Sequence, residues 1–255
     1  MTTPRTGSSR IADIPADVLA GLNSGTLESR TLAEGLAVDF AQLLSAAVSD
    51  VPADYLQMVR DAAGQGITRR MELVGGILLR HLGRERLPEV AGHTSDTVRG
   101  WACYLVGQLP KVKLKERLNL IRPLADDPHF SVREWAWMAV RPDLTSNIPH
   151  AVKLLTPWTA DASPFIRRFA VESMRPRGVW ASHIEALKQN PELALPLLDP
   201  LKADPEKYVQ DSVANWLNDA AKSQAMWVTT TCQRWRRESD SPHTVRITQR
   251  AVQSI

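Results

Sequence analysis

The side chains best suited to chemistry lie in one segment, SPFIRRFAVESMRPRGVW. Arg168, Glu172 and Arg175 recur at i, i+4 and i+7, so they share one face of a helix. Arg177 and Trp180 follow in the next turn. A carboxylate among arginines can stabilise a developing positive charge, and guanidinium groups suit phosphate oxygens. The alternative interpretation is an exposed, ion-paired helix face without chemical function.

Local signals predict the helix that positions this stripe. Ser163 can cap free backbone N–H groups, and Pro164 suits the first helical position. Ile166 and Phe169 follow at a spacing that turns both toward a core. We expect the helix to end at Pro176, because proline cannot continue the hydrogen-bond ladder.

The same segment is one copy of an internal repeat. The pentapeptide VRGWA at Val98 recurs as VREWA at Val132 and IRRFA at Ile166, with degenerate copies at Val209 and Val245. These starts lie about 34 to 43 residues apart. Each follows a turn or cap: Ser95-Asp96, Asp127-Pro128, Ser163-Pro164, Asp204-Pro205 and Ser241-Pro242. Helix pairs at this period are typical of an α-solenoid, in which each pair buries its apolar face on its neighbours.

The rest of the chain fits an all-α fold without strands. We expect second helices of the repeats at 114–124, 148–158, 183–188 and 193–201, and N-terminal helices at 27–47, from Pro52, and at 68–82 before Gly83. Arg141-Pro142 and Arg175-Pro176 are expected to close two of the repeat helices. The predicted architecture is a HEAT-like repeat α-solenoid, a curved right-handed stack of antiparallel helix pairs. Residues 1–12 are predicted to be disordered and residues 13–255 to form a single HEAT-like repeat domain.

Composition narrows the function classes only moderately. The chain has 255 residues with 31 Lys+Arg and 28 Asp+Glu, a net charge of +3, which allows a polyanionic partner without requiring one. Cys103 and Cys232 are far apart and fit neither a disulfide framework nor a zinc site. No signal peptide or membrane-spanning run is apparent, so we expect a cytoplasmic protein.

The repeat places further carboxylates on the stripe that carries Glu172. Equivalent positions hold Glu134 in the preceding repeat and Asp211, Asn215 and Asp219 in the following one. Carboxylates sharing a groove could stabilise the cation that develops when a glycosidic bond breaks. A solvated polar concave face is the alternative. Three basic clusters could follow a phosphate backbone: Arg167 to Arg177, Lys111 to Arg117, and Arg234, Arg236, Arg237, Arg246 and Arg250.

Three longer motifs resemble a known family. VREWAWMAVRP, FIRRFAVESMRPRGVW and YVQDSVANWLNDAAK are similar to the HEAT-like DNA alkylation repair proteins of the AlkC/AlkD superfamily, with the AlkC branch closest. The resemblance covers about residues 20–250. It implies a DNA glycosylase that excises cationic N-alkylated bases such as 3-methyladenine from double-stranded DNA, a hydrolase of base excision repair that needs no metal or cofactor. Some AlkC members carry a C-terminal immunoglobulin-like domain, and we expect none in this sequence.

The resemblance also implies roles for single residues. Glu134, Glu172 and Asp219 match the acidic positions expected around the lesion, and one of them would stabilise the oxocarbenium-like sugar and orient water. Arg168 would contact a phosphate near the lesion, and Trp216 would pack against the lesioned nucleotide. The further residues predicted to bind DNA are Trp137, Arg175, Arg177, Trp180 and Asn215.

Three functions therefore remain open from the sequence. The first is a monomeric alkylbase DNA glycosylase. The second is a HEAT-repeat protein that binds DNA structure without catalysis, which predicts salt-sensitive duplex binding and no base release. The third is a protein–protein scaffold, which predicts no affinity for duplex DNA.

Overall fold

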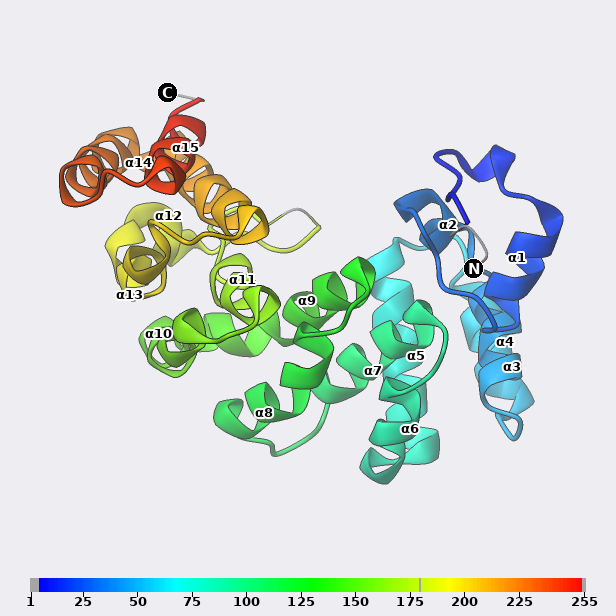
Figure 1. Cartoon of the computed structure of the whole chain (residues 1–255). Coiled ribbons are helices and arrows are strands. Elements are labelled where there is room, and N and C mark those ends of the chain that lie inside the picture. Colours follow the sequence, from blue (N-terminus) through cyan, green and yellow to red (C-terminus); the bar gives the residue numbers. More distant parts are fainter. Residues whose placement is uncertain (1–4, 179, 254–255) are drawn as a thin grey trace. The chain divides into compact units, whose positions relative to one another are not determined.

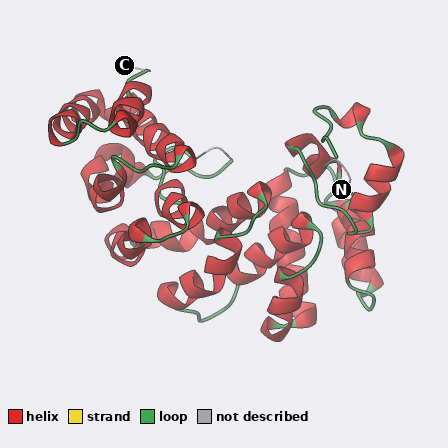
Figure 2. Ribbon diagram, in the orientation of Figure 1, coloured by secondary structure: helices red, strands yellow, loops and turns green. Residues whose placement is uncertain are grey.

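Every regular element of the described chain is a helix (Figure 2). The computed structural model describes residues 5–178 and 180–253. The chain divides into two compact units: residues 1–112 with 128–139, and residues 113–127 with 140–255. The all-α prediction is confirmed, whereas one repeat domain over residues 13–255 stays a prediction. None of the described helices combines the length and apolarity needed to span a bilayer.

The first unit begins with short helices and continues with longer ones (Figure 1). They are η1 (Ile11–Asp13), α1 (Ala16–Asn23), α2 (Leu32–Ala37), α3 (Phe40–Ala47), α4 (Ala53–Asp61), α5 (Ile67–Leu82), η2 (Arg84–Arg86), α6 (Leu87–Ala91) and α7 (Asp96–Gly107). Helix α7 packs against α5 and α6. Trp101 of α7 is fully buried, edge-on to Phe40, and anchors this core. The predicted stop of α5 is confirmed, since Gly83 follows it at φ 74°.

The single helix predicted over 27–47 is wrong. The structure has two helices there, α2 and α3, each with its own side-chain cap. Thr31 accepts from the backbone N–H of Glu34, and Asp39 accepts from those of Ala41 and Gln42. These caps stabilise two helix starts, whereas the apolar spacing runs on through the break.

The N-terminal segment meets α2 through one buried carboxylate. Residues 1–4 of the stretch predicted to be disordered lie outside the described part. Arg5 donates to both oxygens of Glu34, at 2.6 and 2.9 Å, and the backbone N–H of Ser8 donates to the same side chain. These contacts lower the pKa of Glu34 to about 2, the hydrogen bond from Arg5 having the largest effect. Glu34 is therefore a structural anion that ties residues 5–8 to α2.

The second unit contains the remaining helices, and α9 (Phe130–Ser146) contributes residues to both units. The others are α8 (Leu114–Ala125), α10 (Ile148–Leu155), η3 (Thr156–Ala160), α11 (Pro164–Glu172), α12 (Glu185–Gln189), η4 (Pro191–Ala194), α13 (Leu195–Leu198), η5 (Asp199–Leu201), α14 (Lys207–Glu238) and α15 (Pro242–Ala251). Helix α14 is two helices joined at a kink at Gln224, where φ is −136° and ψ is 54°. It packs against α11, α12 and α15.

The predicted repeat starts are confirmed as helix starts. Val98, Val132, Ile166 and Val209 are each the third residue of a helix, and Val245 is the fourth residue of α15. Side-chain caps form at three of the predicted places: Ser95, Ser163 and Ser241. The capping signals therefore set the frame of the repeat.

The residue after Val98, Ile166 and Val209 has a common structural function. Arg99 donates to the carbonyl oxygens of His93 and Thr94, and Arg167 to those of Asp161 and Ala162. In the degenerate repeat, Gln210 donates to the carbonyls five and six residues before it in the same way. In these three repeats the second position thus satisfies carbonyls of the turn preceding its helix, whereas Arg246 in the last repeat donates to the side chains of Gln210 and Asp211.

One predicted helix end is wrong. Pro142 lies inside α9, which continues to Ser146. Proline removes one N–H donor but does not force a helix to stop where flanking turns hold it. The equivalent prediction for Pro176 is confirmed, because α11 ends at Glu172.

Candidate functional site

The predicted stripe forms a buried ion network at the end of α11. Oε1 of Glu172 accepts from Nη1 of Arg175 at 2.7 Å, and its Oε2 accepts from the Ser212 hydroxyl at 2.5 Å. Nη2 of Arg168 lies 3.6 Å from the same Oε2. Only 4% of Glu172 is exposed. The carboxylate is therefore held on both oxygens, by groups of α11, of the turn that follows it and of α14.

Arg175 joins this carboxylate to a second one. Its Nε and Nη2 donate to Oδ2 of Asp219, at 2.9 and 2.8 Å. Asp219 lies in the first segment of α14, is 4% exposed, and has Nζ of Lys222 3.6 Å from its Oδ1. The structure thus brings together two of the three predicted catalytic carboxylates, with one arginine between them.

The network keeps Glu172 and Arg175 charged. Burial alone would raise the pKa of Glu172, but the charges of Arg168 and Arg175 and the hydrogen bonds from Ser212 and Arg175 outweigh it, so this pKa is lowered. Burial alone would lower the pKa of Arg175, and the two carboxylates reverse that effect and raise it. At neutral pH the site is consequently a set of ion pairs without a neutral acid at Glu172.

Two further predicted arginines border the network. The guanidinium of Arg168 lies over the Tyr208 ring, 4.4 Å from its centroid. Arg177 donates through Nε to the Asp219 carbonyl at 3.3 Å and through Nη2 to the Ser223 hydroxyl at 2.6 Å. Arg177 therefore holds α14 immediately before its kink at Gln224.

The two tryptophans predicted to bind DNA in this region, Trp216 and Trp180, differ in their exposure to solvent. Trp216 is fully buried and donates from Nε1 to the Met174 carbonyl at 2.8 Å, so here it presents no surface to a nucleotide. Its predicted contact with the lesioned nucleotide stays a prediction. Trp180 is 52% exposed, at a φ of 62°. Asn215, also predicted to bind DNA, is half-buried on α14.

The third predicted carboxylate belongs to the first unit. Glu134, half-buried on α9, accepts from Nε1 of Trp137 at 2.8 Å, and Trp137 is itself 3% exposed. The two predicted residues thus form a local pair one helical turn apart. Glu172 and Asp219 lie in the second unit.

Much of the predicted C-terminal basic cluster is paired with acids. Arg234 contacts Asp199 and Glu238, at 2.7 and 3.3 Å. Arg246 lies 2.6 Å from Asp211. In the cluster that begins at Lys111, Arg117 is buried and lies 2.7 Å from Asp143. These arginines form ion pairs within the protein. Less positive charge is therefore available to a partner than the number of basic residues in the clusters indicates.

One buried arginine was not predicted as a site residue. Arg141 of α9 donates to the carbonyl oxygens of Ser173, Arg175 and Ser182, which flank the network. Its position inside an otherwise apolar stretch, WMAVRP, is the signal that could have marked it. An arginine among apolar residues is buried only where its donors find acceptors.

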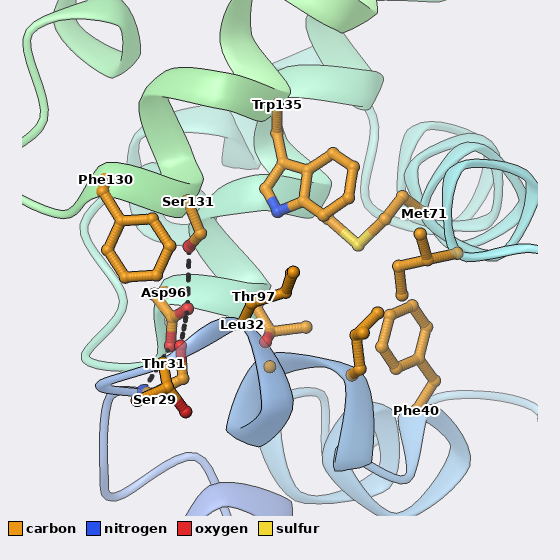
Figure 3. Close-up of a pocket in the computed structure, with 13 residues that line it drawn as sticks. Ser29, Thr31, Leu32, Phe40, Met71, Asp96, Thr97, Phe130, Ser131 and Trp135 are labelled. Atoms are coloured by element: carbon orange, nitrogen blue, oxygen red, sulfur yellow. Dashed lines mark hydrogen bonds between the residues drawn. The ribbon is translucent and has the colours of Figure 1, made fainter. Parts of the chain in front are cut away.

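The first unit has a pocket of its own (Figure 3). Asp96 lies at one side, where it accepts from the hydroxyls of Ser29 and Ser131, at 2.7 and 2.9 Å. Leu32, Phe40, Met71 and Trp135 form the apolar side. The cavity measures about 30 Å³, room for about one water molecule rather than a ligand. Within the described ranges, no three His, Cys, Asp or Glu side chains are grouped to hold a metal ion.

The ion network lies in a part of the chain that matches a known protein family. The family described as DNA alkylation repair enzyme matches residues 134–246. YhaZ of Bacillus subtilis (strain 168), an uncharacterised protein, is 33% identical over 135 residues, which cover 53% of this chain and 36% of YhaZ. The matched stretch therefore spans about a third of that relative's length.

Solved structures share the fold. The alkylpurine DNA glycosylase AlkC of Pseudomonas fluorescens, solved bound to DNA containing an abasic site analog, matches with a TM-score of 0.69 and 23% identity. The match covers 97% of this chain and 65% of that one. AlkD2 of Streptococcus mutans matches with a TM-score of 0.61 and 23% identity over 79% of this chain and 99% of its own. The smu.31 protein of Streptococcus mutans UA159 gives 0.60 and 22% over 79% and 98%.

These likenesses confirm the HEAT-like all-α fold class. Residues 134–246, which include Glu134, Glu172, Arg175 and Asp219, carry the sequence pattern of the DNA alkylation repair enzyme family, so the resemblance seen in the sequence motifs is confirmed.

Proposed function

We propose that this protein is a DNA glycosylase that excises cationic N-alkylated bases, such as 3-methyladenine, from double-stranded DNA. The observation that carries the proposal is the Glu172–Arg175–Asp219 network, which lies wholly within the region that matches the DNA alkylation repair enzyme family. AlkC, whose fold extends over nearly the whole chain, is named as an alkylpurine DNA glycosylase and supports the same assignment.

The chemistry required of the protein is limited. A base that already carries a positive charge is a good leaving group, so the enzyme need not protonate it. It must hold the duplex and stabilise the positive charge that develops on the deoxyribose. No metal or cofactor is needed for these steps, and we propose that the protein acts as a cytoplasmic monomer in base excision repair.

The ion network suggests how a carboxylate could become available. In this structure Arg175 occupies one oxygen of Glu172 and one of Asp219. A DNA phosphate that binds Arg175 or Arg168 competes for the same guanidinium donors. The carboxylate released from its arginine can then face the cationic sugar. Glu172, Asp219 and Glu134 are the proposed catalytic residues, and Arg168, Arg175 and Arg177 the proposed phosphate contacts.

The first experiment measures release of methylated bases from duplex DNA treated with dimethyl sulfate. We expect the wild-type protein to release 3-methyladenine or another cationic base, and Glu172→Gln and Asp219→Asn to release at least about tenfold less. Melting curves of the variants check that the fold is retained. If both folded variants excise like the wild type, the catalytic assignment is wrong.

A second candidate function is suggested by the hydrogen bonding of the same two carboxylates. Both are 4% exposed, and both already accept hydrogen bonds from Arg175. A protein that only binds DNA structure could use the network as a rigid basic surface. It would bind duplex DNA in a salt-sensitive manner and release no base in the same assay.

A further inference from the structure

A loop next to the network carries two of the residues that the sequence predicts to bind DNA, Arg177 and Trp180. It leads from Pro176 to Ile184, and the backbone N–H of Ile184 donates to the Pro176 carbonyl at 2.9 Å, which closes the loop at its base. Arg177 and Trp180 lie on it, and Val179 is outside the described residues. Trp180 is 52% exposed with a φ of 62°, in the left-handed region that bulky residues rarely adopt. Such a conformation persists only where the surroundings hold it.

Arg141 is the group that holds both sides of this loop. Its Nη1 donates to the Ser173 carbonyl at 2.8 Å and its Nη2 to the Arg175 carbonyl at 2.7 Å. On the far side of the loop, Nε and Nη2 donate to the Ser182 carbonyl at 3.3 and 3.0 Å. Arg141 is 3% exposed, so it cannot itself contact DNA in this conformation.

The guanidinium suits this task better than any other side chain. Its donors lie in one plane and point in fixed directions, so one group can serve carbonyls on two sides of a loop. Gly178 permits the close approach, because a Cβ there would lie 3.3 Å from Nη2 of Arg141. Burial, with a smaller effect from the Arg175 charge, lowers the pKa of Arg141 to about 10. The side chain therefore remains charged at neutral pH.

We propose that Arg141 is a positioning residue for DNA engagement, which fixes the main chain at Arg175 and holds the loop that presents Arg177 and Trp180. This inference rests on the proposed function, because the loop is positioned for a DNA substrate. Arg141 acts through the loop and not on the reacting atoms. Its loss should consequently affect loop order and DNA processing together.

The test combines amide hydrogen exchange with single-turnover excision. Arg141→Lys keeps the charge but replaces the planar donors with one ammonium group. We expect exchange at the amides of residues 177, 178 and 180–184 to rise about tenfold or more, with little change in α14. The excision rate on dimethyl-sulfate-treated duplex should fall about tenfold or more. The matched control is Arg99→Lys, which alters another buried arginine that donates to two loop carbonyls. It should leave both readouts unchanged.

A double-mutant cycle distinguishes positioning from general destabilisation. Trp180→Ala removes an exposed side chain and should leave the fold intact. If Arg141 acts through the loop, Arg141→Lys combined with Trp180→Ala should be no worse than the more severe single variant. The proposal would be overturned if the losses in excision rate of the two single variants multiplied in the double variant, or if exchange became faster throughout the second unit. Either result would indicate a purely structural function for Arg141.

A loop-side variant covers the case in which Arg141→Lys does not fold. Gly178→Ala adds a methyl group 3.3 Å from Nη2 of Arg141 and 3.2 Å from Cβ of Ala181. We expect faster exchange at residues 177, 178 and 180–184 and slower excision, and both changes should be smaller than for Arg141→Lys. Unchanged loop exchange, or a loosened loop with unchanged excision and duplex affinity, would overturn the proposal. If the wild type releases no base, the proposed glycosylase function fails, and loop exchange with duplex affinity still decides whether Arg141 positions the loop.

Discussion

At the scale of single residues, the acids of the network act first as counterions. Glu172 and Asp219 are almost wholly buried, and each accepts from Arg175. Buried charges are tolerated only when paired and hydrogen-bonded, and removing one partner leaves the other uncompensated. Any catalytic effect of a Glu172 variant must therefore be separated from its effect on stability.

Stability should depend on pH through Glu172. Its pKa is lowered in the folded protein from an ordinary 4.5, so its contribution is fully present above pH 4.5 and is lost as pH falls through the folded pKa. We expect Glu172→Gln to cost about 2 to 4 kcal/mol of unfolding free energy at pH 7. The difference from wild type should shrink below pH 4.5. Urea unfolding at pH 7, 5.5 and 4 tests this.

An exposed glutamate provides the control. Glu192→Gln should differ little from wild type at every pH, because surface substitutions without specific contacts usually change stability by less than about 0.5 kcal/mol. A stability gap for Glu172→Gln that stays constant down to pH 4 would show that the charge of Glu172 does not stabilise the fold.

The two cysteines give a second residue-scale prediction. Cys103 is fully buried, and burial raises the pKa of Cys232 to about 11. At pH 8 the thiolate fraction of Cys232 is then on the order of one in a thousand. We expect no thiol to react with an aromatic disulfide reagent in the native protein and both to react after unfolding. Rapid reaction of one equivalent in the folded state would contradict this, and Cys232→Ser would identify the thiol.

At the scale of the elements, the repeat copy that begins at Ile166 has two neighbouring arginines with different functions. Arg167 donates to two turn carbonyls and lies 2.6 Å from Asp204. Arg168 lies over Tyr208 and near Glu172. The sequence placed both in one basic cluster, because adjacency in sequence does not reveal which side chain is bound internally.

This difference predicts that the same substitution has a larger effect on stability at Arg167 and a larger effect on duplex affinity at Arg168. Arg167→Met should cost about 2 to 4 kcal/mol of stability, because it leaves Asp204 and two turn carbonyls without their donor. Arg168→Met should cost less, about 1 to 2 kcal/mol, because Glu172 keeps its hydrogen bonds from Arg175 and Ser212, and it should reduce duplex affinity more than Arg167→Met does. Urea unfolding and fluorescence anisotropy with duplex DNA measure the two effects. The assignment is wrong if both variants lose stability and affinity equally.

The helices were largely predictable because their signals are local. Ser95, Ser163 and Ser241 cap helices where the sequence placed them, and Gly83 stops α5. The break before Phe40 was missed, since buried apolar residues continue through it and only the Asp39 cap marks it. Local signals define where repeats begin, and tertiary contacts decide where helices bend or continue.

At the scale of the whole molecule, contacts between distant segments were the least predictable part of the site. The Glu172–Arg175 pair follows from helical spacing, but the Arg175–Asp219 pair joins residues 44 apart. Trp216 is buried and Trp180 exposed, although both have apolar and polar residues close by in the sequence. Side-chain burial depends on how the helices stack, and that stacking could not be read from the sequence pattern or from the small net charge.

The net charge of +3 is small for a protein proposed to bind DNA, so affinity should depend on where the charge lies. Arg246 is paired with Asp211, whereas Arg177 contacts a carbonyl and a hydroxyl and keeps its charge uncompensated by those partners. Each phosphate contact contributes about −0.9 to the slope of log affinity against log salt. With three proposed phosphate contacts we expect a wild-type slope of about −3, and Arg177→Gln should reduce its magnitude by about 0.9.

Arg246→Gln is the matched control, because it removes the same charge from a position that is already ion-paired. Its slope should equal that of the wild type if local phosphate contacts determine binding. Equal reductions for both variants would instead indicate that total charge governs the interaction, and a wild-type slope near zero would contradict duplex binding by this basic surface. The same titrations therefore connect the placement of single arginines to the behaviour of the whole molecule on DNA.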